Sequence, residues 1–327
     1  MSAGQGCLPA LLRLVLMNFI KRPVHFLGYL AVKATTVLFA LLPWDRAVKA
    51  GAFMGRAATG LVRGRFELTK ENIRRALPEL SEAQVRETAL KSWENMGVVV
   101  AEVLSAAQLG KKELLSRFEV TNPQVLRDLQ RQGRGAIVHF GHFANWELAA
   151  VGISALDLPV CAVVRHIRNP YVDDMLKAIR TRFGAEVIFH RDPFFSCVRN
   201  LKRGKFLGIL MDQNCPAGDI YAPFMGRQAA TTPLTALLAL KLQTPVLPMR
   251  VTRANGKLLV TFEEPIYPDT AYSPETMHAL IDKLNARLEA WIRAEPHLWL
   301  WAHNRWKREG DALRFEKEHI HHASARA

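Results

Sequence analysis

The pattern of apolar and polar residues divides the chain into three parts. Residues 8–42 are mostly apolar, in two runs separated by Lys21-Arg22-Pro23. Residues 67–109 repeat apolar side chains at steps of three and four, which is the period of an amphipathic helix, and Ser81 followed by Gln84 is a helix start signal. From residue 134 onward, short apolar runs alternate with amphipathic stretches. The pattern predicts a hydrophobic N-terminal helix, a helical preface and an alternating region.

The alternating region predicts an ordered series of strands and helices. The predicted strands are 135–139, 159–164, 186–189, 206–211, 246–252 and 257–263, and the predicted helices are 145–153, 170–183, 194–203, 233–242 and 274–294. Asn255-Gly256 predicts a tight turn between the last two strands. Such alternation favours an α/β fold with a mainly parallel central sheet flanked by helices. We expect a hydrophobic membrane segment at 1–45, a main domain at 46–310 and a polar tail at 311–327, with the main domain divided into the preface at 46–133 and the α/β core at 134–310.

The second apolar run, residues 24–42, is close to the length that crosses a bilayer. A crossing needs about 20 apolar residues, and Lys33 near the centre of the run costs about 3 kcal/mol on insertion. A transmembrane helix, an interfacial helix and a buried core helix all stay open, and a cleaved signal peptide is disfavoured because no small-residue cleavage site follows. The heavier positive charge after the run predicts a cytoplasmic body. The basic residues there are Arg46, Lys49, Arg56, Arg63 and Arg65.

The net charge of +14 and the pI near 9.9 predict a polyanionic partner. Nucleic acid, an anionic membrane, a phosphorylated glycolipid and an acidic carrier protein all fit that charge. We expect no nucleic acid, because the chain has no zinc spacing, RNA-binding signature or recognition-helix pattern. The four cysteines are far apart and form no Cys-x-x-Cys, which excludes a disulfide framework and a zinc site of that type. We expect no metal and no cofactor.

The segment 135–147 sets an imidazole, His142, and a carboxylate, Glu147, five positions apart just after a predicted strand. Residues five apart on one helix point about 140° from each other, so His142 is expected in the loop and Glu147 in the first helical turn. From there the carboxylate can hold one ring nitrogen while the other faces a substrate, which is the geometry of a general base. The alternative, in which His142 bonds to the local backbone and Glu147 favours the helix N-terminus, stays open.

Polar groups also follow the next three predicted strands. They are Arg165-His166, His190-Arg191-Asp192 and Asp212-Gln213. Because ligands collect at the carboxyl ends of strands in parallel sheets, these groups and His142 are expected at one edge. For residues 190–192 an ordinary loop charge is the preferred interpretation.

Several blocks of the chain resemble the bacterial lipid A biosynthesis acyltransferases, the late lauroyl/myristoyl transferases within the lysophospholipid acyltransferase superfamily. The segment 139–148 resembles their H-x4-D/E motif. The other matching blocks are Val164-Arg165 with Arg168-Asn169-Pro170 and Ile179-Arg180, Met211-Asp212-Gln213 with 224–227 and 230–233, and the C-terminal segment 299–307. The resemblance covers roughly residues 20–307 and includes the hydrophobic N-terminus.

The resemblance implies transfer of a fatty acyl group from acyl carrier protein to a hydroxyl of a lipid A precursor, at the cytoplasmic face of the inner membrane. His142 would act as the general base with Glu147 fixing its tautomer, Arg165 would stabilise the oxyanion, and Asp212 would support the site. The expected substrate-binding residues are Asn145, Gln213, Arg227, Thr231 and Thr232. The alternatives for Asn145 and Thr232 are helix capping, and the Trp299–Trp306 cluster is expected to pack or to lie at a lipid interface.

Two alternatives to this function stay open. The same chemistry on another glycolipid, phospholipid or aminolipid acceptor fits the motifs equally, and a non-catalytic lipid-binding protein would keep the fold. The intact His142 and Glu147 disfavour the second alternative. The acyl chain length, the acylated position, the choice between carrier-bound and coenzyme A-bound donor and the oligomeric state do not follow from the sequence.

Overall fold

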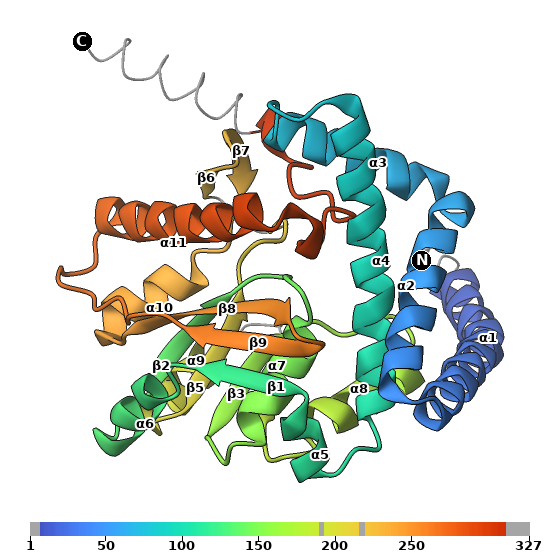
Figure 1. Ribbon diagram of the computed structural model, residues 1–327, viewed down its shortest axis with the longest axis horizontal. Helices are drawn as coiled ribbons and strands as arrows, with labels where there is room; N and C mark the ends of the chain where they lie inside the picture. Colours follow the sequence, from blue (N-terminus) through green and yellow to red (C-terminus); the bar gives the residue numbers. More distant parts are fainter. Residues whose placement is uncertain (1–6, 190–192, 216–219, 312–327) are drawn as a thin grey trace, which may run out of the picture.

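The protein has a helical N-terminal part and an α/β body (Figure 1). The computed structural model describes residues 7–189, 193–215 and 220–311, with side chains described from residue 22. Its helices are α1 (Cys7–Leu41), α2 (Trp44–Leu61), α3 (Arg63–Ala76), α4 (Glu82–Ala106), α5 (Lys111–Ser116), α6 (Gln124–Arg131), α7 (Trp146–Ser154), α8 (Pro170–Thr181), α9 (Phe194–Lys202), α10 (Leu234–Leu242), α11 (Pro274–Ala294) and the 3₁₀ turn η1 (Pro296–Leu298). Its strands are β1 (Phe118–Thr121), β2 (Ala136–Phe140), β3 (Val160–Val164), β4 (Glu186–Phe189), β5 (Phe206–Leu210), β6 (Tyr221–Phe224), β7 (Arg227–Ala230), β8 (Val246–Ala254) and β9 (Lys257–Phe262).

The central sheet has seven strands in the order β1-β9-β8-β2-β5-β3-β4. Every neighbouring pair is parallel except β8 and β9, which form an antiparallel hairpin. Asn255 and Gly256 turn this hairpin with φ of 53° and 71°, the positive values that a type I′ turn requires. The predicted α/β fold with a mainly parallel sheet is therefore confirmed.

The order of the strands creates a switch point between β2 and β5. The chain moves from β2 to β3 to β4 in one direction and returns through β5 to β8 in the other. Right-handed crossovers then place α7 and α8 on one face and α9 and α10 on the other, and the members of each pair pack together. Because β2 and β5 are neighbours whose connections leave to opposite faces, a crevice opens beyond their carboxyl ends.

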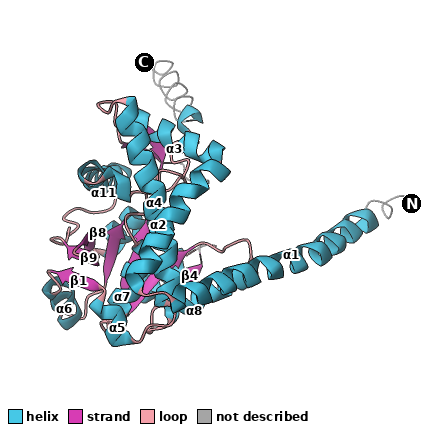
Figure 2. Ribbon diagram, turned by 45° about the vertical axis from the view of Figure 1, so that its right-hand side comes forward, coloured by secondary structure: helices cyan, strands magenta, loops and turns pink. Residues whose placement is uncertain are grey.

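Helix α4 packs the helical N-terminal part against the α/β body. As predicted, α4 starts after Ser81, whose side chain and that of Gln84 form a capping box. Helices α2 and α4 approach so closely that a Cβ added at Gly97 would lie 2.0 Å from the carbonyl oxygen of Gly51. Figure 2 shows α1 projecting away from the body. Its side chains Val24, Leu27, Leu38 and Leu41 are 62 to 77% exposed.

Two parts of the sheet structure were not predicted. Strand β1 contains only four residues with Glu119 among them, and its ladder with β9 places a segment from before residue 134 at the sheet edge. The β6–β7 hairpin forms a separate two-stranded sheet. Pro223 in β6 has no backbone N–H to donate, and a proline within a short segment argues against a strand, so the sequence pattern did not predict β6.

Candidate active site

The register of two parallel strands brings His142 to Asp212. Phe140 of β2 pairs with Leu210 of β5, and each strand ends there. His142 and Asp212 each lie two residues after this pair, so their side chains meet beyond the carboxyl edge of the sheet. His142 Nδ1 lies 2.8 Å from Asp212 Oδ1, and the backbone N–H of His142 donates to Asp212 Oδ2 at 2.7 Å.

Asp212 is a buried carboxylate that accepts three hydrogen bonds. Its side chain is 1% exposed, and the Trp299 indole N–H donates to Oδ2 at 2.8 Å beside the two bonds from His142. Burial works against the ionised form, but the His142 ring and these three donors hold the pKa of Asp212 well below its usual range. An ionised Asp212 only accepts, so the neutral imidazole carries its proton on Nδ1 and has its lone pair on Nε2.

The C-terminal segment fixes the loop that carries His142. Phe143 forms a β-bridge with Trp299, and the backbone N–H of Leu300 donates to the His142 carbonyl at 3.1 Å. Ala144 adopts φ of 47°, a conformation that L-residues avoid, while its N–H donates to the Leu298 carbonyl at 2.9 Å. The loop is therefore held in a strained shape by backbone contacts from a distant part of the chain.

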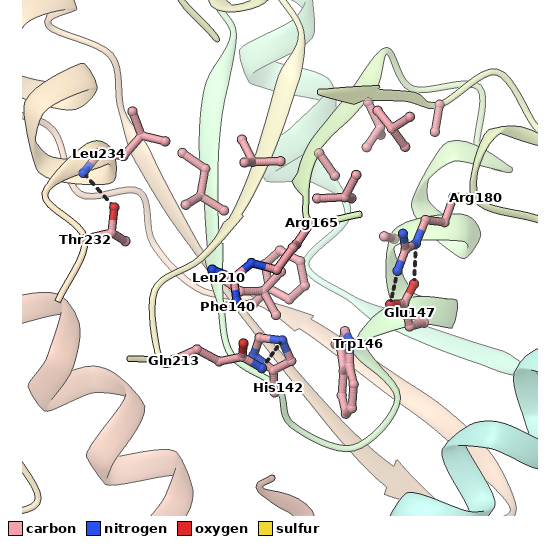
Figure 3. Close-up of a pocket in the computed structure, with 18 of the residues that line it drawn as sticks. Phe140, His142, Trp146, Glu147, Arg165, Arg180, Leu210, Gln213, Thr232 and Leu234 are labelled. Carbon is pink, nitrogen blue, oxygen red and sulfur yellow. Dashed lines mark hydrogen bonds and ion pairs between the residues drawn. The ribbon is translucent and has the colours of Figure 1, made fainter. Parts of the chain in front are cut away.

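Glu147 does not hold the His142 ring, which corrects the interpretation of the H-x4-E spacing. Its carboxylate binds the Arg180 guanidinium of α8 through two hydrogen bonds of 2.6 and 2.8 Å. Figure 3 shows this pair on the far side of Trp146 from Gln213. The first turn of α7 directs Glu147 toward α8, whereas the ring nitrogen faces the end of β5.

A pocket opens beside the His142 ring and encloses about 270 Å³. Its polar lining includes His142, Gln213, Arg165 and the Glu147–Arg180 pair. The apolar wall comes from β2, β3, β4, β5 and α7, through Phe140, Val160, Ala162, Val164, Val187, Leu210 and Val151. The pocket therefore extends from the carboxyl edge of the sheet, where the polar groups lie, to the amino ends of β3 and β4. An aliphatic chain fits this distribution of polar and apolar surface.

Comparison with known proteins assigns the chain to a family. The sequence profile of the bacterial lipid A biosynthesis acyltransferases matches residues 19–308. The chain belongs to this family. Acyl transfer in lipid A biosynthesis is the activity that this membership supports, and the resemblance predicted from the motifs is confirmed.

Two curated relatives cover most of the acyltransferase. The lipid A biosynthesis lauroyltransferase of Escherichia coli (strain K12) is 26% identical over 290 residues, which span 87% of this chain and 92% of that protein. The lipid A biosynthesis palmitoleoyltransferase of the same organism is 24% identical over 280 residues, spanning 83% and 88%. The crystal structure of the 1-acyl-sn-glycerophosphate acyltransferase PlsC from Thermotoga maritima aligns with 74% of this chain and 97% of that chain, at a TM-score of 0.37 and 12% identity.

Asn145 is a structural residue in the acyltransferase, as the capping alternative predicted. Its side chain accepts from the Leu148 N–H at the start of α7 and donates to Glu102 at 2.7 Å. Asn145 is fully buried, and Glu102 is 3% exposed and paired with Arg253. The Asn145 amide therefore has its hydrogen-bond partners inside the protein and does not face the pocket.

Of Arg227, Thr231 and Thr232, which were expected to bind substrate, only Thr232 lines the pocket. Its hydroxyl also accepts from the Leu234 N–H at 3.4 Å, but α10 begins at Leu234 with Pro233 as the preceding residue, so Thr232 lies one position before the cap that was predicted for it. Arg227 instead forms an ion pair with Glu309, and Thr231 is fully buried. These two residues turn inward because β7 packs against the C-terminal segment, which corrects the expectation that they bind substrate.

The remaining candidates lie apart from the His142–Asp212 pair or outside the described residues. His166 follows Arg165 and forms its own pair with Asp173 at 2.6 Å. Residues 190–192 lie outside the described residues. Within the described residues, no group of three or more His, Cys, Asp or Glu side chains is arranged to hold a metal ion.

Sequence reasoning missed the residues that support the acyltransferase site from the C-terminal segment. The Trp299–Trp306 cluster was expected to pack or to face lipid, and the structure buries Trp299, Trp301 and Trp306. Arg305 is fully buried and donates to the carbonyls of Gln213 and Ala230. The signals in the sequence were the family resemblance of segment 299–307 and its density of tryptophan and basic residues, and neither identifies the residues that these side chains contact.

Proposed function

We propose that this acyltransferase moves a fatty acyl group from an acyl carrier protein thioester to a hydroxyl of a lipid A precursor, with His142 as the general base and Asp212 as the group that orients it. The observation that carries the proposal is the His142–Asp212 hydrogen bond at the mouth of a largely apolar pocket. The family supports acyl transfer in lipid A biosynthesis. The geometry supports the roles of the individual residues.

The proposed reaction is a direct displacement. His142 Nε2 takes the proton of the acceptor hydroxyl as its oxygen bonds to the thioester carbonyl carbon, and the C–S bond then breaks. The imidazolium returns that proton to the leaving thiolate, so the products are an ester and a thiol. Asp212 keeps the ring in the required tautomer and stabilises the transient positive charge. No acyl-enzyme forms.

Arg165 is the proposed donor to the developing oxyanion. It lines the pocket, and Figure 3 shows its guanidinium group directed toward the end that His142 occupies. A cation at this place stabilises the charge on the carbonyl oxygen as the tetrahedral centre forms. Loss of one such donor typically costs about 10²–10³ in rate.

The proposed location is the inner membrane, with the catalytic body on the cytoplasmic side. Among the described residues, one helical stretch, Arg22–Leu41, is long and apolar enough to cross a bilayer, and only 6% of its apolar window is buried. Its exposed side chains match hydrocarbon, and the net charge of +14 attracts anionic headgroups, a phosphorylated acceptor and an acidic carrier protein.

The test compares wild type with His142→Ala and Asp212→Asn in detergent, using acyl carrier protein thioesters and a lipid A precursor, with product detected by mass spectrometry. His142→Ala is expected to lose about 10²–10⁴ in transfer rate, and Asp212→Asn up to about 10⁴ because it reverses the ring tautomer. His278→Ala, an exposed histidine on α11, is the control. Full transfer by His142→Ala would remove the proposed base. Parallel reactions with coenzyme A thioesters and with phospholipid acceptors test the donor and acceptor separately.

A further inference from the structure

Both ring nitrogens of His142 have hydrogen-bond partners. Asp212 binds Nδ1, and Gln213 Nε2 lies 3.0 Å from His142 Nε2. Because the ring proton is on Nδ1, the Gln213 amide donates and the Nε2 lone pair accepts. Figure 3 shows the Gln213 side chain reaching the ring from the pocket wall. The atom that has to take the proton from the attacking hydroxyl is therefore covered.

The backbone around Gln213 is anchored, so the side chain approaches the ring from a fixed position. Arg305 Nη1 donates to the Gln213 carbonyl at 3.2 Å, and the N–H of the following Asn214 donates to His303 Nε2 at 3.0 Å. Burial, opposed by the Asp212 charge, lowers the pKa of His303 to about 4, which keeps that ring neutral and able to accept. Asp212 directly precedes Gln213. Asp212, which orients the base, and Gln213, which covers it, therefore lie in one loop that these contacts hold in place.

Covering Nε2 has a consequence for a bound thioester. Water near the pocket can be activated only if it reaches the lone pair of Nε2, within about 2.6–3.2 Å. A single water that displaces the Gln213 amide only exchanges one part-buried hydrogen bond to Nε2 for another, and it brings no further binding energy to hold the amide away from the ring. A lipid acceptor brings contacts remote from the reacting hydroxyl, and these can supply that energy.

We propose that Gln213 caps the catalytic base until a lipid acceptor displaces it, and so selects acyl transfer over hydrolysis of the thioester. The inference rests on the proposed function, because it requires His142 to be the base. In transfer, the acceptor oxygen bonds to the acyl carbon, the C–S bond breaks, and the acceptor proton passes through Nε2 to the thiolate. In hydrolysis, water supplies the oxygen and the proton in the same way, and the products are a fatty acid and a thiol.

The test measures how thioester cleavage is divided between the two reactions. Total cleavage is followed by release of the carrier thiol, and lipid product and free fatty acid are quantified by mass spectrometry, each with and without acceptor. Gln213→Met keeps the length of the side chain and removes the donor, and Gln213→Asn withdraws the amide by one methylene. Gln132→Met, at an exposed position after α6, makes the same chemical change away from the site.

We expect the ratio of hydrolysis to transfer to rise in both Gln213 variants by roughly threefold to tenfold, which is the effect of one net hydrogen bond. Gln132→Met is expected to keep the wild-type ratio. An unchanged ratio in the Gln213 variants, or an equal fall of both reactions, overturns the cap. Gln213→Asn carries the test if Gln213→Met does not fold, as judged by thermal unfolding. If wild type itself shows no transfer to any lipid acceptor, the proposed function fails, whereas wild-type transfer with an unaltered ratio removes only the cap.

Discussion

Glu147 and Arg180 form a two-bond ion pair that joins the first turn of α7 to the last turn of α8. Both side chains are mostly buried, with 23% and 18% exposed. The pair lies in the pocket wall, while His142 takes its orientation from Asp212. Of the two carboxylates near the histidine, Asp212 thus binds the ring and Glu147 binds Arg180 in the pocket wall.

Replacement of Glu147 is expected to affect stability more than the chemical step. Glu147→Gln leaves the Arg180 guanidinium without its counter-charge, which should cost ~2 kcal/mol, between the values for exposed and fully buried pairs. Transfer should fall less than in Asp212→Asn, because the His142–Asp212 bond persists. Urea unfolding and steady-state kinetics measure the two effects. Glu147→Gln combined with Arg180→Met should recover part of the stability. A loss of activity equal to that of Asp212→Asn would mean that Glu147 acts on the ring after all.

Glu102 is expected to matter for both folding and activity. It is 3% exposed, pairs with Arg253 and holds the Asn145 amide that caps α7. Glu102→Gln leaves the partly buried Arg253 guanidinium, 25% exposed, without its counter-charge, so the free energy of unfolding should fall by at most about 3–5 kcal/mol. Glu94→Gln, which breaks the exposed pair with Arg56, is the control and should cost at most about 1 kcal/mol. Equal losses of unfolding free energy in the two variants would contradict the role of Glu102 as a buried partner of Arg253 and Asn145.

His139 should make stability depend on pH on the acid side of neutrality. Burial, only partly opposed by the Leu284 carbonyl, lowers the pKa of His139 from 6.5 to about 4. Between these values the unfolded chain binds more protons than the folded one, so the contribution is complete above pH 6.5 and is lost as pH falls toward 4. The maximum effect is about 3 kcal/mol. His139→Gln, which retains a donor for Leu284, should flatten urea unfolding profiles over this range, and an unaltered slope would contradict the assignment.

The exposed apolar side chains of α1 are expected to bind the bilayer. Leu27 and Leu38 are each 64% exposed, so their replacement should not disturb packing. The double variant Leu27→Glu, Leu38→Glu should reduce binding to anionic vesicles, because each charge in the apolar stretch Arg22–Leu41 costs up to about 3 kcal/mol on insertion, the value for the helix centre. Flotation measures binding, and Leu27→Ala with Leu38→Ala is the matched control. Wild-type flotation by the charged variant would mean that another surface holds the membrane.

The local pattern was sufficient to predict most of the elements. Helix α11 coincides with the predicted 274–294, strand β4 with 186–189, and Ser81 starts α4. These elements are encoded by periodicity and by capping or turn residues, which act over a few positions. The family motifs likewise depend only on neighbouring residues. So does the change from the helical pattern to the alternation of short apolar runs with amphipathic stretches.

Only the tertiary structure decided which residues of the site contact each other. Asp212 meets His142 because β2 and β5 are adjacent and in register, and the same pairing places Gln213 on the second ring nitrogen. Glu147, the nearer acid in sequence, faces α8 instead. Strand order and register arise from contacts between segments far apart in the chain, so no local pattern of residues records them. The sequence therefore determined which residues are candidates for the site, and the packing of distant strands determined which of them touch.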